Sequence, residues 1–144
     1  MPNDATHRII NYLMLSIFIV LNFYFDIEQD YKFIMIFMGS YILGTEVLSP
    51  DLDIRSKPGD RLGFLSYPIR KLSNHRGLGH NIFIGWILKA LYVTLIMTII
   101  LVVIDKLGYN IYLILKYIDK RSIFAFLIGL FLSNAVHIMA DNIL

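Results

Sequence analysis

The sequence predicts an all-α integral membrane protein: a bundle of four spanning helices with a long polar cytoplasmic loop and a short interfacial helix. Hydrophobic residues make up 57% of the 144 residues. A soluble domain of this size could not bury so much apolar surface, so a bilayer is the natural solvent. The polar residues gather instead in one long passage, residues 46–80. The length suits a single domain, residues 1–144.

Four apolar runs are the candidate spans, and polar or charged residues separate them. They cover residues 9–25, 33–48, 82–104 and 123–144. A helix rises 1.5 Å per residue, so about 20 residues cross the hydrocarbon core. A fifth run, residues 111–118, is too short to span. It is expected to lie at the interface or to extend the last helix.

The basic residues set the expected orientation. Residues 50–80 carry six of the thirteen Lys and Arg residues, whereas residues 26–30 are acidic. The long loop should therefore be cytoplasmic, and both chain ends should share that side because the number of spans is even. Residues 105–121, with four basic residues, argue against this orientation, but the larger cluster decides it. We expect the protein in the cell (inner) membrane, in contact with membrane lipid.

The candidate metal ligands all fall near span ends on the predicted cytoplasmic side. Histidine and aspartate side chains that lie far apart along the sequence are therefore expected to meet in one pocket on that side. These residues are His7, Asp51, Asp53, His75, His80, His137 and Asp141.

The last span carries an informative helical pattern. His137 and Asp141 are four residues apart, so they share one face. Going back along that face, the residue at each turn is small, as in membrane helices that pack closely against neighbours. The face with the metal ligands is therefore predicted to be buried, with Asn134 as a partner for His137. The small residues are Ser133, Gly129 and Ala125, and Ser40 and Gly44 offer small-residue contacts on the second span.

The donor types indicate which ions would bind. The chain has no cysteine, which excludes thiolate sites. Imidazoles with carboxylates suit divalent metal ions, with zinc as the first expectation and manganese as the alternative. The candidate donors exceed one tetrahedral shell, so two or three ions are expected. The simpler alternative is that Asp51 and Asp53 are loop acids that pair with Arg55 and Lys57.

Four motifs together resemble a known family. They are T-H at residues 6–7, S-P-D-L-D at 49–53, H-R-G-x-x-H at 75–80 and H-x-x-x-D at 137–141. This set resembles the predicted metal-binding proteins and their relatives, the membrane-bound metal-dependent hydrolases, which are similar to zinc-dependent phospholipase C. The resemblance implies that the seven candidates above are metal ligands and that the chemistry concerns a phosphoester. Gly79 departs from the pattern, which usually has Ser or Thr there.

These observations favour a membrane-bound metal-dependent hydrolase acting on a phosphoester or lipid-linked substrate at the cytoplasmic headgroup level. Asp53 and Arg76 are the candidate catalytic residues. Arg76 is chosen because a guanidinium beside the metal site can bind a phosphate oxygen. A non-catalytic metal-binding protein and a divalent-cation transporter are the alternatives. Glu46 is expected to face headgroups, with a supporting contact to the metal ligands as the alternative. Lys89 is expected to snorkel, although from a buried face it could stabilise a developing anion. The net charge of +2 does not favour a nucleic-acid partner, and the oligomeric state stays open.

Overall fold

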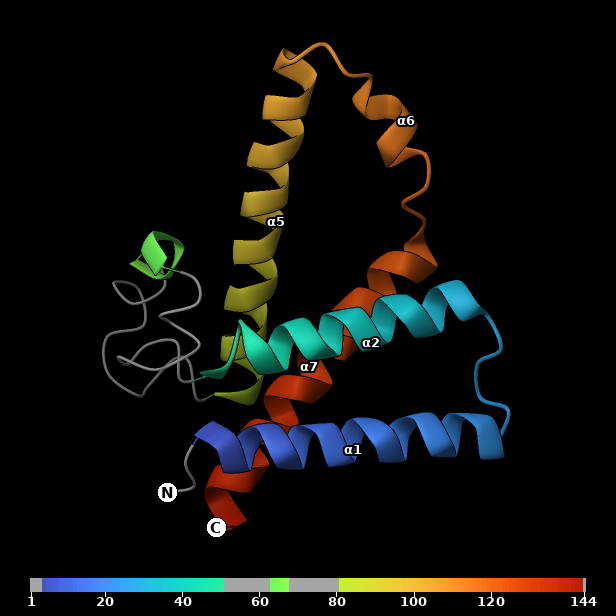
Figure 1. Cartoon of the computed structure of the whole chain (residues 1–144), viewed down its shortest axis with the longest axis vertical. Coiled ribbons are helices and arrows are strands. Elements are labelled where there is room, and N and C mark those ends of the chain that lie inside the picture. Colours follow the sequence, from blue (N-terminus) through green and yellow to red (C-terminus); the bar gives the residue numbers. More distant parts are fainter. Residues whose placement is uncertain (1–3, 51–62, 68–80, 144) are drawn as a thin grey trace.

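The computed structural model describes residues 4–50, 63–67 and 81–143, and the regular structure of these residues is entirely helical. The predicted all-α class is therefore confirmed for this part of the chain. Most of the predicted polar loop lies outside the described residues. The elements in chain order are α1 (Asp4–Tyr24), α2 (Tyr31–Glu46), the short 3-10 helix η2 (Gly63–Leu65), α5 (Ile82–Lys106), α6 (Ile111–Leu115) and α7 (Lys120–Ile143) (Figure 1).

Short polar side chains and a glycine set several helix boundaries. Asp30 caps α2 and Asn81 caps α5, each by accepting hydrogen bonds from backbone N–H groups of the first turn. Asn110 caps α6 in the same way. After α5 the chain turns at Gly108, where φ is 86°, a left-handed conformation that glycine adopts without steric cost. These ends therefore follow from local sequence signals.

Three helices, α1, α5 and α7, are long and apolar enough to cross a membrane. The helix α2 has 16 residues, or about 24 Å of helix, which is less than the ~30 Å hydrocarbon core. Spans are therefore supported for three of the four predicted runs, and the crossing by α2 stays a prediction. The segment 111–118 does not extend the last helix, because α6 ends at Leu115 before α7 begins at Lys120.

The helices α2 and α7 make the most extensive contact between elements, and small residues bring their backbones together. A Cβ added at Gly129 would lie 2.0 Å from Ser40 Oγ and 2.6 Å from Phe37 O. A Cβ added at Gly44 would lie 2.0 Å from Ser133 Oγ. Close approach of this kind is how membrane helices gain van der Waals contact. The predicted small, buried face of α7 is confirmed at Ala125, Gly129 and Ser133.

The helix α5 joins this pair through its first turns only. Trp86 Nε1 donates a hydrogen bond of 3.1 Å to Leu127 O, and its indole packs edge-on against Phe131. The second half of α5 exposes most of its apolar side chains. In Figure 1, α5 runs crosswise to α1 and α2, and α6 follows at its far end. The predicted bundle of four spanning helices thus stays a prediction.

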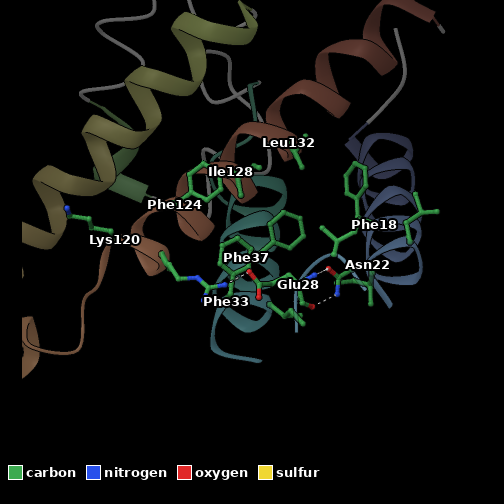
Figure 2. A pocket seen from close by; sticks show the side chains of 14 residues that line it. Phe18, Asn22, Glu28, Phe33, Phe37, Lys120, Phe124, Ile128 and Leu132 are labelled. Carbon is green, nitrogen blue, oxygen red and sulfur yellow. Dashed lines mark hydrogen bonds and ion pairs between the residues drawn. The ribbon is translucent and has the colours of Figure 1, made fainter. Parts of the chain in front are cut away.

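A cavity of about 650 Å³ lies between α1, α2 and α7. Figure 2 shows apolar side chains from all three helices converging on it, and polar residues at one end. Its walls include Phe18 of α1, Phe33 and Phe37 of α2, and Ile128 and Leu132 of α7. The three helices are therefore not close-packed along their whole length.

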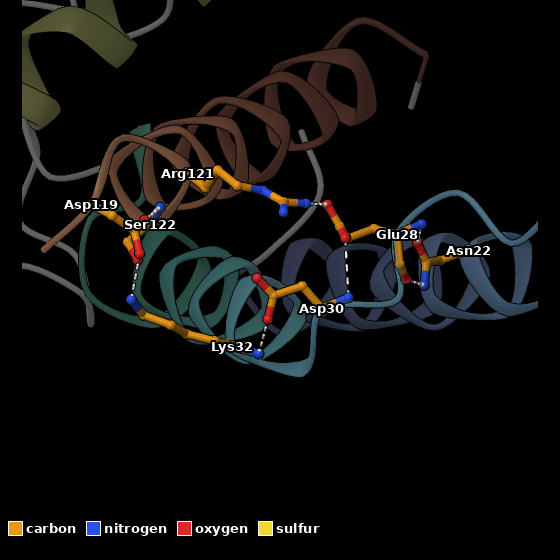
Figure 3. Close-up of polar contacts among 7 residues, drawn as sticks. All are labelled: Asn22, Glu28, Asp30, Lys32, Asp119, Arg121 and Ser122. Atoms are coloured by element: carbon orange, nitrogen blue, oxygen red, sulfur yellow. Dashed lines mark hydrogen bonds and ion pairs between the residues drawn. The ribbon is translucent and has the colours of Figure 1, made fainter. Parts of the chain in front are cut away.

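Ion pairs connect the α1–α2 turn and the start of α2 to the start of α7 (Figure 3). Glu28 Oε2 pairs with Arg121 at 2.6 Å, and Asp119 Oδ2 pairs with Lys32 Nζ at 2.6 Å. The side chain of Asn22 bonds to the backbone N–H and C=O of Glu28 and so fixes the turn. These ion pairs thereby join two segments that are distant in sequence, the region around the start of α2 and the start of α7.

The glycine contacts predict unequal effects of the same small substitution. Gly129→Ala is expected to lower the free energy of unfolding by about 1–3 kcal/mol, because its methyl group would meet backbone atoms of α2. Gly44→Ala should also destabilise, but Ser133→Ala should partly rescue it, because the obstructing atoms belong to that side chain. The measurement is unfolding in mixed micelles.

The matched control is Gly39→Ala on α2, where an added Cβ has no neighbour within 4 Å among the described residues. It should leave the stability unchanged or slightly raised. Equal losses in Gly39→Ala and Gly129→Ala would contradict the close contact.

The pair at the start of α7 predicts a dependence of stability on pH. Hydrogen bonds from Lys32 Nζ and from the Ser122 N–H lower the pKa of Asp119 well below its usual range. A carboxylate with a lowered folded-state pKa stabilises the fold above its unfolded pKa, and the contribution is lost as the pH falls through the folded pKa. Asp119→Asn should therefore be less stable than the wild type at pH 7, with the difference shrinking below about pH 4. Thermal unfolding at low salt measures this, and Asp105→Asn at the end of α5 is the control.

Candidate metal centre

His7 from the start of α1 lies beside His137 and Asp141 from the end of α7. His7 Nε2 lies 3.1 Å from Asp141 Oδ1, and His137 Nε2 lies 3.8 Å from Asp141 Oδ2. The imidazole rings stack with centroids 3.9 Å apart and planes 12° apart. His7 and His137 are only 3% and 4% exposed. Figure 1 shows the start of α1 and the end of α7 close together here.

Polar contacts with α2 hold the start of α1 in place. Asn11 Nδ2 donates a hydrogen bond of 3.1 Å to His7 O, and Tyr41 OH donates one of 3.2 Å to Asn11 Oδ1. Both side chains are buried, so each needs such a partner away from water. His7 and Asn11 share a helix face, as their four-residue spacing predicts. The orientation of α1 at the centre is therefore tied to α2.

The position of His137 follows from the contact between α2 and α7. It lies one turn after Ser133, which packs against Gly44 of α2. The chain leaving α2 then brings the buried Ser49 to the imidazole, with Ser49 Oγ 3.5 Å from His137 Nδ1. The segment that follows α2 thus begins beside the centre.

The three side chains fit a divalent metal ion. Each offers one ligand atom, and these atoms lie within 4.8 Å of one another. Ligand atoms about 2.1 Å from a tetrahedral ion are separated by about 3.4 Å. The two contacts to Asp141, of 3.1 and 3.8 Å, bracket that value, so its carboxylate oxygens lie at ligand separations from both imidazoles. Two imidazoles and a carboxylate also form a donor set that zinc and manganese accept.

The structure brings together three of the seven predicted ligands. His7, His137 and Asp141 form the group just described. The other predicted site residues lie outside the described residues: Asp51, Asp53, His75, Arg76 and His80.

Glu46 was expected to face the headgroups, and the structure gives it a different role. Its Oε1 accepts hydrogen bonds of 2.7 Å from Arg8 Nε and from Tyr12 OH. These contacts join the end of α2 to the start of α1. The spacing of four between Arg8 and Tyr12 places both on one face of α1, but no sequence signal identifies Glu46 as their partner.

The expectation that Lys89 snorkels is wrong, because its side chain is only 6% exposed. Lys89 Nζ donates a hydrogen bond to Asn134 Oδ1, and Asn134 Nδ2 donates one of 3.1 Å to Ile82 O. Asn134 therefore links α7 to α5. It was predicted to be a partner of His137, but its hydrogen bonds among the described residues go to Lys89 and Ile82. A buried ammonium is stable in such a place only when polar groups surround it.

Comparisons with known proteins bear on this centre. A sequence model of a family described as "Uncharacterized metal-binding protein" matches residues 2–144. An uncharacterized protein of Aquifex aeolicus (strain VF5) is 44% identical over 70 residues, which make up 46% of this chain and 48% of that protein. The match thus spans about half the length of this curated relative. No solved structure matches the chain.

Metal binding at this centre predicts a specific gain in stability. Zinc or manganese at about 100 times its dissociation constant should raise the free energy of unfolding by about 2.7 kcal/mol. Asp141→Asn and His7→Ala should lose most of this gain, because each removes a donor from the group. Unfolding in micelles with and without the ion, together with elemental analysis, provides the measurement.

Asp105→Asn is the control, since it removes an exposed carboxylate at the end of α5 and should keep the full metal response. An equal response in Asp141→Asn and the wild type would contradict a role for Asp141 in metal binding.

Proposed function

The chain belongs to the family of uncharacterized metal-binding proteins, and from this we propose that it is a membrane-bound metal-dependent hydrolase with a phosphoester or lipid-linked substrate. The observation that carries the proposal is the buried group of His7, His137 and Asp141 at the ends of two membrane-length helices. The family match over residues 2–144 also supports treating the chain as one domain.

The position of the group suggests where the substrate is met. His7 lies in the first turn of α1, and Asp141 lies in the last turn of α7. The ends of spanning helices reach the headgroup region of a bilayer. A substrate in that layer, such as a lipid phosphoester, would therefore reach the site without entering the hydrocarbon core. We place this side in the cytoplasm of a cell with an inner membrane, following the basic residues of the loop.

Chain connectivity supports the remaining predicted ligands. Ser49 lies beside His137, and two residues of extended chain span at most about 7 Å. Asp51 and Asp53 follow Ser49 closely enough to contribute to the same centre. Ile82 O accepts a hydrogen bond from Asn134, one turn before His137. His80 is two residues before Ile82, so it is also within reach of the centre. With His75, these residues would provide donors for two or three ions.

The proposed chemistry divides between the ion and the side chains. A bound divalent ion would lower the pKa of water and polarise a phosphoryl oxygen. The imidazoles of His7 and His137 and the carboxylate of Asp141 would hold it at the membrane surface. Arg76, between two predicted ligands, would bind a phosphate oxygen and stabilise the negative charge that develops there. Asp53 would hold the metal site and orient the reacting groups.

A structural role for the metal is the second candidate, and one observation favours it. Away from this centre, α1 contacts α2 and α7 only sparsely, whereas α2 and α7 contact each other closely. An ion held by His7 and Asp141 would fasten α1 to α7 and so stabilise the fold without catalysis.

Hydrolysis assays separate the two candidates. The full chain in vesicles, loaded with zinc or manganese, is tested against phosphomonoesters, phosphodiesters and glycerophospholipids. We expect turnover that Asp53→Ala and His75→Ala abolish while leaving the protein in the membrane. Arg76→Ala should lower kcat by about 10²-fold with metal content unchanged.

A wild-type chain that binds metal, gains stability from it and hydrolyses none of these substrates would support the structural role instead. Turnover that is unchanged in Asp53→Ala and His75→Ala would remove the hydrolase proposal. Asp105→Asn again serves as the control for both assays.

A further inference from the structure

We propose that the cavity between α1, α2 and α7 binds one acyl chain of an anionic phospholipid, with the phosphate at the start of α7. The cavity of about 650 Å³ is lined by aromatic and aliphatic side chains from all three helices. Figure 2 shows Phe18, Phe37 and Leu132 directed into the shared space from α1, α2 and α7. Such walls do not hold water favourably and suit an apolar occupant.

The length of the cavity fits an acyl chain of a single leaflet. Its lining on α7 extends from Lys120 to Leu132, which is about 18 Å of helix. Half of a ~30 Å hydrocarbon core is about 15 Å. The cavity therefore matches the depth that one lipid tail occupies when its headgroup stays at the membrane surface.

The mouth of the cavity has the charge that a phosphate needs. Lys120 and Arg121 line the cavity at the start of α7, and Glu28 is the one acid of the lining, so the lining carries a net charge of +1. Arg121 pairs with Glu28 (Figure 3), whereas Lys120 has no ion-pair partner among the described residues. A basic side chain at the membrane surface raises the affinity for an anionic lipid about fivefold. This favours an anionic over a zwitterionic headgroup.

The site is distinct from the metal centre. Asn22 at the mouth and His7 at the centre are 15 residues apart on α1, or about 22 Å of helix. The headgroup of the bound lipid would therefore lie at the opposite end of the helical unit and cannot be the substrate held at the metal centre. The proposal is independent of catalysis.

Photolabelling tests this site in the full chain. The protein is placed in phosphatidylcholine vesicles that contain phosphatidylglycerol with a diazirine on one acyl chain. We expect the label on α7, around Ile128 and Leu132, to exceed that on the exposed second half of α5, around Ile99. Ile128→Trp, which fills the cavity, should lower the α7 label about fivefold, and Ile99→Trp is the matched control.

Two further variants keep the test decisive. Phe18→Trp fills the cavity from the opposite wall, so it replaces Ile128→Trp if that variant does not fold. Lys120→Gln should lower the α7 label from the phosphatidylglycerol probe about fivefold and leave that from a phosphatidylcholine probe unchanged. Asp141→Asn should be labelled like the wild type, because the metal centre is separate.

Equal labelling of α7 and α5 in the wild type would overturn the proposal, since it would indicate bulk lipid only. Equal labelling of α7 by both probes, with no effect of Lys120→Gln, would overturn the assignment to an anionic phospholipid.

Discussion

The close contact between α2 and α7 is the constraint on which the rest of the structure depends. In lipid there is no hydrophobic force that drives helices together, so two helices associate through van der Waals packing and polar bonds. Gly129 and Gly44 provide that packing by admitting Ser40 and Ser133. The contact then fixes His137 on α7 beside Ser49 after α2. The metal centre is thus a consequence of where two glycines allow two backbones to meet.

Much of this arrangement follows from spacing within single helices. The four-residue repeat of small residues identified the buried face of α7, and the same repeat placed His137 and Asp141 together. The partners across helices could not be predicted in this way. Periodicity reports which face of a helix is buried but not which residue of another helix it meets, so the roles of Glu46 and Lys89 emerged only from the structure. The membrane crossing by α2 and the loop ligands remain predictions for a related reason, because neither follows from a helical repeat.

Polar contacts concentrate at the end of the unit that carries the metal centre. Asn11 bonds to Tyr41, and Lys89 bonds to Asn134, and all four residues are buried or nearly so. Buried polar groups in a membrane protein must find partners within it, so these contacts hold the helices at defined positions. The opposite half has apolar walls around an open cavity and exposed ion pairs at its edge. Buried hydrogen bonds therefore fix the positions of the helices at the end with the metal centre, whereas the opposite end contains an open apolar cavity.

The meeting of His7 with Asp141 also determines when the centre can exist. The helix α1 is synthesised before the other helices, whereas Asp141 lies in the last turn of α7. Contacts between residues so distant in sequence form late in folding, because the loop that separates them must close first. The group of His7, His137 and Asp141 can therefore assemble only after α7 has been made.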